Sequence, residues 1–275
     1  MDIINAIILG IVEGLTEFLP ISSSGHLIVA ESLLGFKDSA ETFTVVIQMG
    51  AILAVIWYYR NDLIKRILGL SSANMQKFWL NIIIASIPAG VLGLIFNKQI
   101  ESLMFHPVPV AIALIVGGII LWIVESRPSN HAQTSELADV DIVTPMQAIW
   151  IGVAQIFALV FPGTSRSGAT IVGGMLTGLN RATSTAFSFY LGMPILVLAS
   201  LYKLFKARDT LSSSVPGGVT ALLVGTVVSF VSALVVVSWL LNYVSRNNFK
   251  PFAIYRIVLG MIILVLVATG VMQNA

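Results

Sequence analysis

Long apolar runs without a charged side chain alternate with short polar stretches along the whole sequence. A charge-free run of about 18 or more residues is long enough to cross a bilayer as a helix. Because such runs fill most of the sequence, the pattern predicts an all-α integral membrane protein rather than a soluble domain. The runs free of Asp, Glu, Lys and Arg cover residues 42–59, 78–97, 107–124, 142–165, 182–202, 210–245 and 257–275.

Composition supports this prediction. Apolar residues make up 57% of the 275 residues and charged residues only 10%, whereas a soluble domain carries about 25% charged residues. The net charge of +2 and the lack of long basic runs argue against a nucleic acid partner. The absence of cysteine excludes disulfides and zinc–thiolate sites. The first apolar run has no basic segment before it, so we expect no cleavable signal peptide.

The sequence matches itself when it is shifted by 142 positions, and residues 109–120 then fall on 251–262 with seven identities in twelve. Because several separate blocks share this shift, we interpret the chain as one membrane domain, 1–275, with an internal duplication. Its repeats are 1–133 and 143–275, and a polar linker at 125–141 overlaps the end of the first. The other matched pairs are Gly10 with Gly152, Pro20 with Pro162, Ser23 with Ser165, and Gly50 with Gly192.

Each repeat begins with an apolar segment broken by proline and a Ser/Thr/Gly cluster, at 3–35 and 146–180. Residues 3–17 would make about 22 Å of helix before Pro20, short of a hydrocarbon core of about 30 Å. We therefore expect each broken segment to be a re-entrant helix–loop–helix. Three transmembrane helices are predicted to follow in each repeat, at 43–59, 79–96 and 108–124, and at 185–203, 217–241 and 252–272.

Three crossings per repeat would insert the second repeat upside down. We therefore expect two inverted-topology repeats whose re-entrant segments meet near the midplane. Many secondary transporters build a substrate site in this way, so a lipid-phosphate transporter or flippase is an alternative to an enzyme. The basic residues favour one side as cytoplasmic and both termini as outside. That side carries Arg60, Lys65, Arg66, Lys77, Arg127, Arg181, Arg246 and Lys250, against Lys37, Lys98, Lys203, Lys206 and Arg208 on the other.

Five ionisable residues remain inside the predicted membrane segments: Glu13, Glu17, His26, Arg166 and Arg256. At that depth such groups are costly unless they are paired or hydrated, so they are candidate functional residues. The alternative is a structural salt bridge that joins two helices. The acids and the imidazole belong to the first repeat and the guanidinium groups to the second.

The repeat alignment shows how the two copies differ at these positions. The shift places Glu13 on Gln155 and Ser24 on Arg166. The first copy is therefore suited to proton or metal chemistry, and the second to holding an anion. Glu13 and Glu17 are four residues apart, so both carboxylates lie on one helix face. Such a pair either shares a proton or binds a hard divalent cation such as Mg²⁺.

Two hydroxyl-rich turns accompany the charges. Ser22, Ser23 and Ser24 precede Gly25, and backbone N–H groups at the helix start near His26 could hold phosphate oxygens. Residues 163–170 form a second Ser/Gly turn, with a guanidinium suited to bidentate phosphate contact. Two such turns meeting from opposite faces predict a phosphate-handling site.

Residues 13–26, EGLTEFLPISSSGH, and 162–170, PGTSRSGAT, resemble the two signatures of the bacterial undecaprenyl-diphosphatase family, also called the bacitracin-resistance protein family. The resemblance covers essentially the whole chain, including residues 251–256, PFAIYR. It implies hydrolysis of undecaprenyl diphosphate to undecaprenyl phosphate and inorganic phosphate, which recycles the lipid carrier of cell-wall synthesis. It also implies a divalent cation, Mg²⁺ or another such as Ca²⁺, and a multi-pass protein of the bacterial plasma membrane with its site open to the outer face.

The resemblance also assigns roles to residues of this chain. The partners it implies are the lipid substrate and membrane lipids, and a homodimer is compatible with the sequence. Two mechanisms stay open: Ser23 attacks phosphorus while Glu17 or His26 accepts its proton, or one of those two groups activates water directly. The implied catalytic residues are Ser23, Glu17, His26 and Arg166, the substrate-binding residues are Ser22, Ser165, Thr170 and Arg256, and the metal ligands are Glu13 and Glu17.

Overall fold

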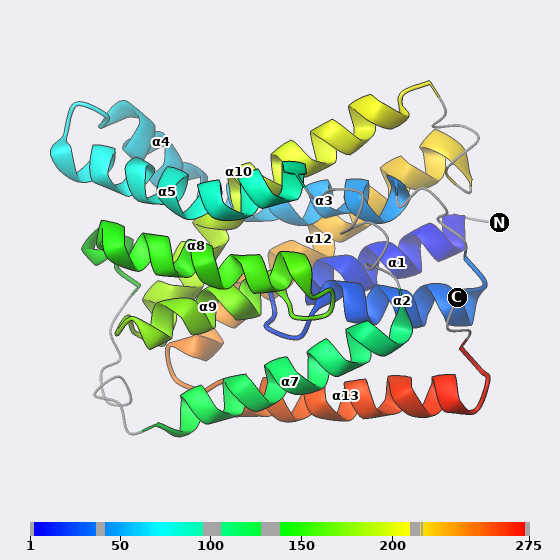
Figure 1. Cartoon of the computed structure of the whole chain (residues 1–275). Coiled ribbons are helices and arrows are strands. Elements are labelled where there is room, and N and C mark those ends of the chain that lie inside the picture. Colours follow the sequence, from blue (N-terminus) through cyan, green and yellow to red (C-terminus); the bar gives the residue numbers. More distant parts are fainter. Residues whose placement is uncertain are drawn as a thin grey trace.

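The computed structural model describes residues 3–36, 42–95, 106–127, 138–209, 215 and 217–272. Within these ranges every regular element is a helix, which confirms the all-α prediction, and Figure 1 shows most of the helices running along one common direction. The predicted linker residues 128–137, and Lys37 and Lys98 of the charge count, lie outside the described residues. The helices are α1 (Ile3–Thr16), α2 (Ser23–Leu34), α3 (Thr42–Tyr58), α4 (Arg60–Leu68), α5 (Ala73–Ile95), α7 (Pro107–Ser126), η2 (Val140–Ile142), α8 (Pro145–Val160), α9 (Arg166–Leu176), α10 (Arg181–Ala207), α12 (Gly218–Val244) and α13 (Lys250–Ala268).

In the part of the chain that the structure describes, five helices, α5, α7, α10, α12 and α13, are long and apolar enough to cross a membrane. They confirm five of the six predicted transmembrane helices, and the chain is a multi-pass membrane protein. The sixth predicted helix, at 43–59, is α3. It bends by 69° into α4, and the two together make up a sixth candidate span.

Residues 60–78, which carry Arg60, Lys65, Arg66 and Lys77 of the predicted cytoplasmic side, are not an irregular loop, because α4 and the first turns of α5 occupy most of them. Charged Asp62, Lys65 and Arg66 alternate with apolar side chains in α4, so the segment is amphipathic and lacks the charge-free run that marks a span. Ile64 and Ile67 remain exposed on its apolar face.

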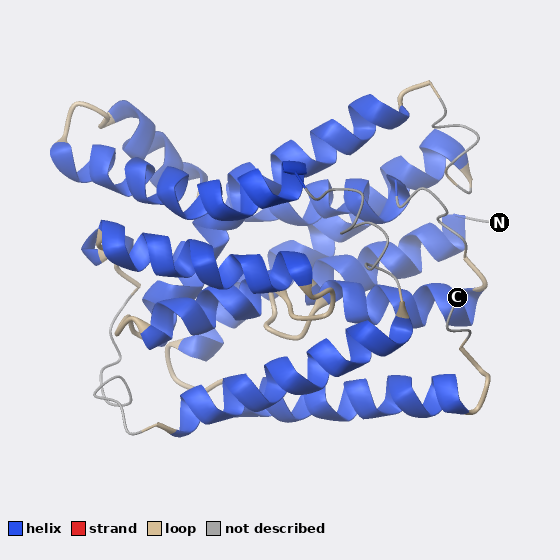
Figure 2. Ribbon diagram, in the orientation of Figure 1, coloured by secondary structure: helices blue, strands red, loops and turns tan. Residues whose placement is uncertain are grey.

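Each predicted broken segment is a pair of short helices around a turn. α1 and α8 are apolar but shorter than a span, and α2 and α9 follow them after residues 17–22 and 161–165. Figure 2 shows these two turns together near the middle of the molecule, away from both ends of the bundle. The opposite insertion of the two repeats stays a prediction.

The two halves of the chain pack against each other in a reciprocal way. α1 lies along α12, and α8 lies along α5, so each broken segment packs on a long helix of the other half. A Cβ at Gly10 would lie 2.6 Å from the Gly225 carbonyl oxygen, and a Cβ at Gly152 would lie 2.7 Å from that of Ala85. The matched glycines of the repeat therefore serve the same purpose, which is close helix contact.

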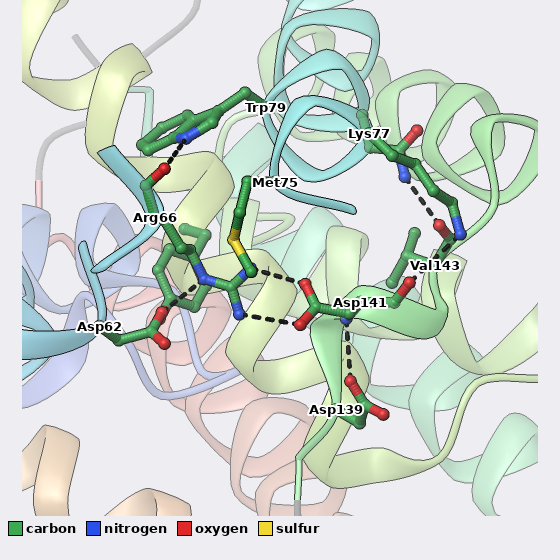
Figure 3. A network of polar contacts seen from close by, with 10 residues as sticks. Asp62, Arg66, Met75, Lys77, Trp79, Asp139, Asp141 and Val143 are labelled. Atoms are coloured by element: carbon green, nitrogen blue, oxygen red, sulfur yellow. Dashed lines mark hydrogen bonds and ion pairs between the residues drawn. The ribbon is translucent and has the colours of Figure 1, made fainter. Parts of the chain in front are cut away.

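A polar network joins α4, η2 and α10 at one end of the bundle (Figure 3). Arg66 Nε lies 2.5 Å from Asp62 Oδ2, and its Nη1 lies 2.6 Å from Asp141 Oδ1. The guanidinium carbon also lies 4.1 Å from the centre of the Phe78 ring, and the Tyr190 hydroxyl donates to Asp62. Arg66, counted among the basic residues of the predicted cytoplasmic side, lies in α4 with its side chain buried.

Candidate active site

The two central turns have the same backbone geometry. Ser22 and Ser165 have φ angles of 72° and 70°, in the left-handed region that residues other than glycine rarely adopt. Each serine caps the helix that follows: the Ser22 hydroxyl accepts from the Gly25 N–H, and the Ser165 hydroxyl accepts from the Gly168 N–H. The two N-termini, of α2 and α9, therefore start from equivalent serines.

This equivalence corrects the alignment of the repeats by one residue. Ser22 and Ser165 are 143 positions apart, so Ser23 of the first turn corresponds to Arg166 of the second. The uniform shift of 142, which places Ser24 on Arg166, is wrong inside the turn. One residue separates Pro20 from Ser22, whereas Gly163 and Thr164 separate Pro162 from Ser165. The second turn accommodates its longer path with Gly163 at a φ of 94°.

Glu17 connects the two turns. The Ser23 hydroxyl donates to Glu17 Oε2 at 2.7 Å, and Arg166 Nη2 donates to Glu17 Oε1 at 2.9 Å. All three side chains are largely shielded from solvent. The structure thus brings together three of the predicted catalytic residues, although Arg166 is 149 positions from Glu17 in the sequence.

α10 fixes the orientation of Arg166. Arg166 Nη1 donates to the Ser188 carbonyl at 3.2 Å, and a Cβ at Gly192 would lie 2.3 Å from Nη1. The Thr170 hydroxyl lies 2.6 Å from the Ser188 hydroxyl, so α9 also contacts the residue whose carbonyl accepts from Arg166. Arg166 Nε is buried and has no hydrogen-bond partner in the described part of the chain.

Glu13 lies one turn before Glu17 and is fully buried. The Glu17 N–H donates to the Glu13 carbonyl at 2.9 Å, which continues the helical turn and keeps the two side chains on one face. Neither carboxylate oxygen of Glu13 finds a hydrogen-bond partner among the described residues. A buried carboxylate without a donor requires a proton or a cation, and a divalent cation fits this donor set.

Protein ligands for such a cation are few. The described residues contain no cluster of three or more His, Cys, Asp or Glu side chains placed to hold a metal ion. Glu13 and Glu17 would therefore provide two carboxylates, and phosphate oxygens or water would complete the shell. This division is common for Mg²⁺, which keeps water and substrate phosphates as ligands.

His26 makes its hydrogen bonds to groups other than Ser23 and Glu17. Its Nδ1 lies 2.7 Å from the Ser22 carbonyl oxygen, and its Nε2 lies 2.7 Å from the Tyr255 hydroxyl. The two rings are stacked at 5.5 Å, with 4° between their planes. Because the Ser22 carbonyl can only accept, Nδ1 carries the hydrogen, and Nε2 of the neutral ring accepts from Tyr255.

Arg256, at 2% exposure, is buried between the turns and α7. Its guanidinium donates to backbone carbonyls, including Pro20 of the first turn and Thr164 of the second. The sequence also predicts that Arg256 contacts the substrate, and this contact stays a prediction.

Residues 6–262 of the chain match the family model described as Bacitracin resistance protein BacA. The chain belongs to this family. It is 53% identical over 272 residues to a protein named Undecaprenyl-diphosphatase 1 from Burkholderia cenocepacia, an alignment that covers 98% of this chain and 96% of that protein. It is 49% identical over 278 residues to a protein named Undecaprenyl-diphosphatase from Deinococcus radiodurans, covering 100% of this chain and 98% of that protein. The resemblance seen in the two signatures is confirmed.

Three contributors to the site of this family member were not predicted: Ser188, Gly192 and Tyr255. Ser188 acts through its backbone carbonyl, and Gly192 acts by leaving room for the Arg166 guanidinium. Neither role leaves a chemical pattern in the sequence. A positional signal existed for Gly192, which matches Gly50 in the repeat, and for Tyr255, which lies inside the recognised segment 251–256.

Proposed function

We infer that this chain hydrolyses undecaprenyl diphosphate to undecaprenyl phosphate and inorganic phosphate. The observation that carries this inference is the contact of Ser23 and Arg166 with one buried carboxylate, Glu17, between two helix N-termini. The names of the relatives from Burkholderia and Deinococcus support the choice of substrate.

Ser23 is placed to act as the nucleophile and Glu17 as its base. The hydroxyl proton moves to Glu17 Oε2 as Ser23 Oγ bonds to the terminal phosphorus and the bridging P–O bond breaks, releasing undecaprenyl phosphate. Water then attacks the phosphorus of the phosphoserine, the P–Oγ bond breaks to release inorganic phosphate, and Glu17 returns its proton to Oγ. Both ring nitrogens of His26 are hydrogen-bonded elsewhere, which favours Glu17 over His26 as the base.

Arg166 and the starts of α2 and α9 stabilise negative charge. Helix N-termini bear partial positive charge and free N–H groups, and α2 and α9 both begin at the central turns. The guanidinium of Arg166 keeps Nε without a partner in the described residues, so it retains donor capacity for a phosphate oxygen.

A divalent cation belongs to this proposal. Glu13, whose oxygens lack a donor among the described residues, and Glu17 would hold it. When bound, it neutralises charge on the diphosphate oxygens. Mg²⁺ is our first choice, with Ca²⁺ as another candidate.

The cellular setting follows from the substrate. We place the protein in the bacterial plasma membrane with its site open to the outer face, where it recycles the lipid carrier for peptidoglycan and contributes to bacitracin resistance. The long apolar tail needs no dedicated polar motif, because exposed apolar helix faces meet the lipid phase. A homodimer stays a prediction, and the size of the detergent-solubilised protein tests it.

Phosphate release from a prenyl diphosphate by the purified protein in detergent tests the activity. We expect release with Mg²⁺ and loss of release with EDTA, and Ser23→Ala should lower the rate by at least about 10³-fold if the serine is the nucleophile. Transfer of the lipid across vesicles without phosphate release under any metal condition would favour the transporter alternative instead.

The two chemical routes differ in one intermediate. With substrate labelled in the terminal phosphate, rapid acid quench should trap label on a peptide that contains Ser23. Undiminished turnover by Ser23→Ala, with no trapped label in the parent protein, would support direct attack by water activated at Glu17.

A further inference from the structure

Arg256 makes hydrogen bonds that converge on the two central turns. Nη1 donates to the Pro20 carbonyl at 3.4 Å, while Nη2 donates to Thr164 at 2.7 Å and to Gly163 at 3.3 Å. A further bond from Nη2, to the Ala113 carbonyl at 3.4 Å, anchors the group on α7. One side chain of α13 therefore contacts both turns and a second long helix.

The carbonyls that Arg256 contacts flank the reacting groups. Pro20 lies between Glu17 and Ser23 in the sequence, and Thr164 lies two residues before Arg166. Carbonyls in a buried turn have no helical partner, and a buried carbonyl without a donor is unfavourable. A guanidinium presents several donors in one rigid fork, so it can satisfy carbonyls from both turns at once.

The surroundings of Arg256 are shaped for its guanidinium. A Cβ at Gly117 would lie 2.0 Å from Nη2, and a Cβ at Gly168 would lie 3.0 Å from Nη1. Within the described residues no carboxylate is ion-paired with Arg256, and its Nε has no partner. The group thus differs from Arg166, which is ion-paired with Glu17.

We propose that Arg256 is a positioning residue that holds the two turns in the mutual register required by the contact of Ser23, Glu17 and Arg166. The proposal rests on the proposed phosphatase activity for its kinetic consequences. Its structural consequence, ordering of both turns together, is independent of that activity. Besides Arg256, Ser167 links the turns, donating from its hydroxyl to the carbonyls of Glu17 at 3.3 Å and Leu19 at 3.1 Å.

Hydrogen exchange tests the structural consequence in the substrate-free protein. In Arg256→Gln, peptides that cover residues 17–26 and 160–170 should both exchange at least about tenfold faster, as expected when a hydrogen bond worth about 1.4 kcal/mol is lost. Peptides from α12 should not change. Unchanged exchange in both turns, or faster exchange in only one, would overturn the proposal whether or not the protein releases phosphate.

Gly117→Ala reaches the same contact without altering Arg256. The new Cβ displaces Nη2, so both turns should again exchange faster, and kcat should fall about 100-fold, the loss that a misplacement of about 1 Å can cause. Gly90→Ala is the matched control: it also replaces a helical glycine, but a Cβ there meets nothing within 4 Å. The control should keep the parent exchange and rate.

Two comparisons separate positioning from direct phosphate contact. Arg256→Lys keeps the positive charge but loses the several N–H donors of the planar guanidinium. If Arg256 positions the turns, the Arg256→Lys variant should have a kcat as low as that of Arg256→Gln, with KM within about threefold of the parent value. If Arg256 instead contacts phosphate directly, Arg256→Lys should restore activity, and KM should rise most in Arg256→Gln.

In the Gly117→Ala/Arg256→Gln double variant the added Cβ has no guanidinium to displace, so its kcat should equal that of Arg256→Gln alone. Multiplied losses would overturn the proposal, whereas absence of phosphate release by the parent protein would overturn only the proposed function.

Discussion

Arg66 and Arg166 are both largely shielded from solvent and both contact carboxylates, but they differ in how many polar atoms around them lack a hydrogen-bond partner. Arg66 sits between Asp62 and Asp141 (Figure 3), and none of the side-chain nitrogens and oxygens of these three residues is buried without a partner in the described structure. Arg166 also has a carboxylate, Glu17, yet its Nε and both oxygens of nearby Glu13 have no partner there.

The difference distinguishes a structural network from a binding site. A closed network has satisfied its hydrogen-bonding capacity, so it stabilises one arrangement of α4, η2 and α10. An open one keeps desolvated polar atoms that are unfavourable until a ligand, cation or proton arrives. Variants of the two clusters should therefore separate activity from stability.

The largest effect is expected at Glu17. Glu17→Gln removes the base for Ser23 and the partner of Arg166, so phosphate release should fall by about 10²–10⁴-fold. The matched variant Asp62→Asn, in the closed network, should keep the rate per folded molecule within about threefold of the parent. Initial rates normalised to monodisperse protein measure both. Equal losses in the two variants would remove the distinction.

Glu13 should decide whether Mg²⁺ stabilises the protein. At a concentration 100 times the dissociation constant, Mg²⁺ should stabilise the parent by about 2.7 kcal/mol, seen as a higher unfolding midpoint in detergent. Glu13→Gln should lose this response and, without metal, be no less stable than the parent, because an unpartnered buried carboxylate is removed. A Mg²⁺ response that survives in Glu13→Gln would place the cation elsewhere.

Arg66 should matter for stability rather than for turnover. Arg66→Met removes hydrogen bonds to two carboxylates that are 42% and 36% exposed and so regain water readily. Because of that screening, we expect a loss of only about 1–3 kcal/mol in unfolding free energy, with the rate per folded molecule retained. The exposed Arg60 is the control, and Arg60→Met should shift the unfolding midpoint far less. Activity lost at unchanged stability would contradict a structural role.

The smallest effect is expected at Tyr255. Tyr255→Phe removes the hydroxyl bound to His26 Nε2 but keeps the stacked ring, so the expected loss is that of one hydrogen bond, about 0.5–1.5 kcal/mol or up to tenfold in rate. If His26 takes part in catalysis, the pH dependence of the rate should differ between Tyr255→Phe and the parent protein. A tenfold loss without any change in the profile would indicate that the pair only packs.

Much of this fold follows from apolar length, because a helix that crosses a bilayer must be long and charge-free. That signal predicts α5, α7, α10, α12 and α13, and the proline-broken segments predict the paired short helices. It fails at α4, where charges mark a loop in the pattern but form an amphipathic helix in the structure. The burial of Arg66 is not predictable either, because its partner Asp141 lies 75 positions away and cannot be paired with it from the sequence.

The site shows the same limit more finely. The chemistry of Glu17, Ser23 and Arg166 is predictable, because charge inside apolar sequence is unfavourable and therefore informative. Which atoms touch is not predictable: a serine carbonyl on α10 and a glycine beside a guanidinium carry no chemical signature. The one-residue insertion in the second turn is also invisible to a uniform shift.

That insertion bears on how such a protein arises. With Ser22 equivalent to Ser165, the serine that donates to Glu17 and the arginine that pairs with it occupy the same position in two copies of one turn. A dimer of identical halves encoded by a single short gene would carry two serines there or two arginines, never one of each. If the two turns descend from one duplicated half, a single chain would permit this asymmetry, because each copy of the turn can then carry its own residue at that position.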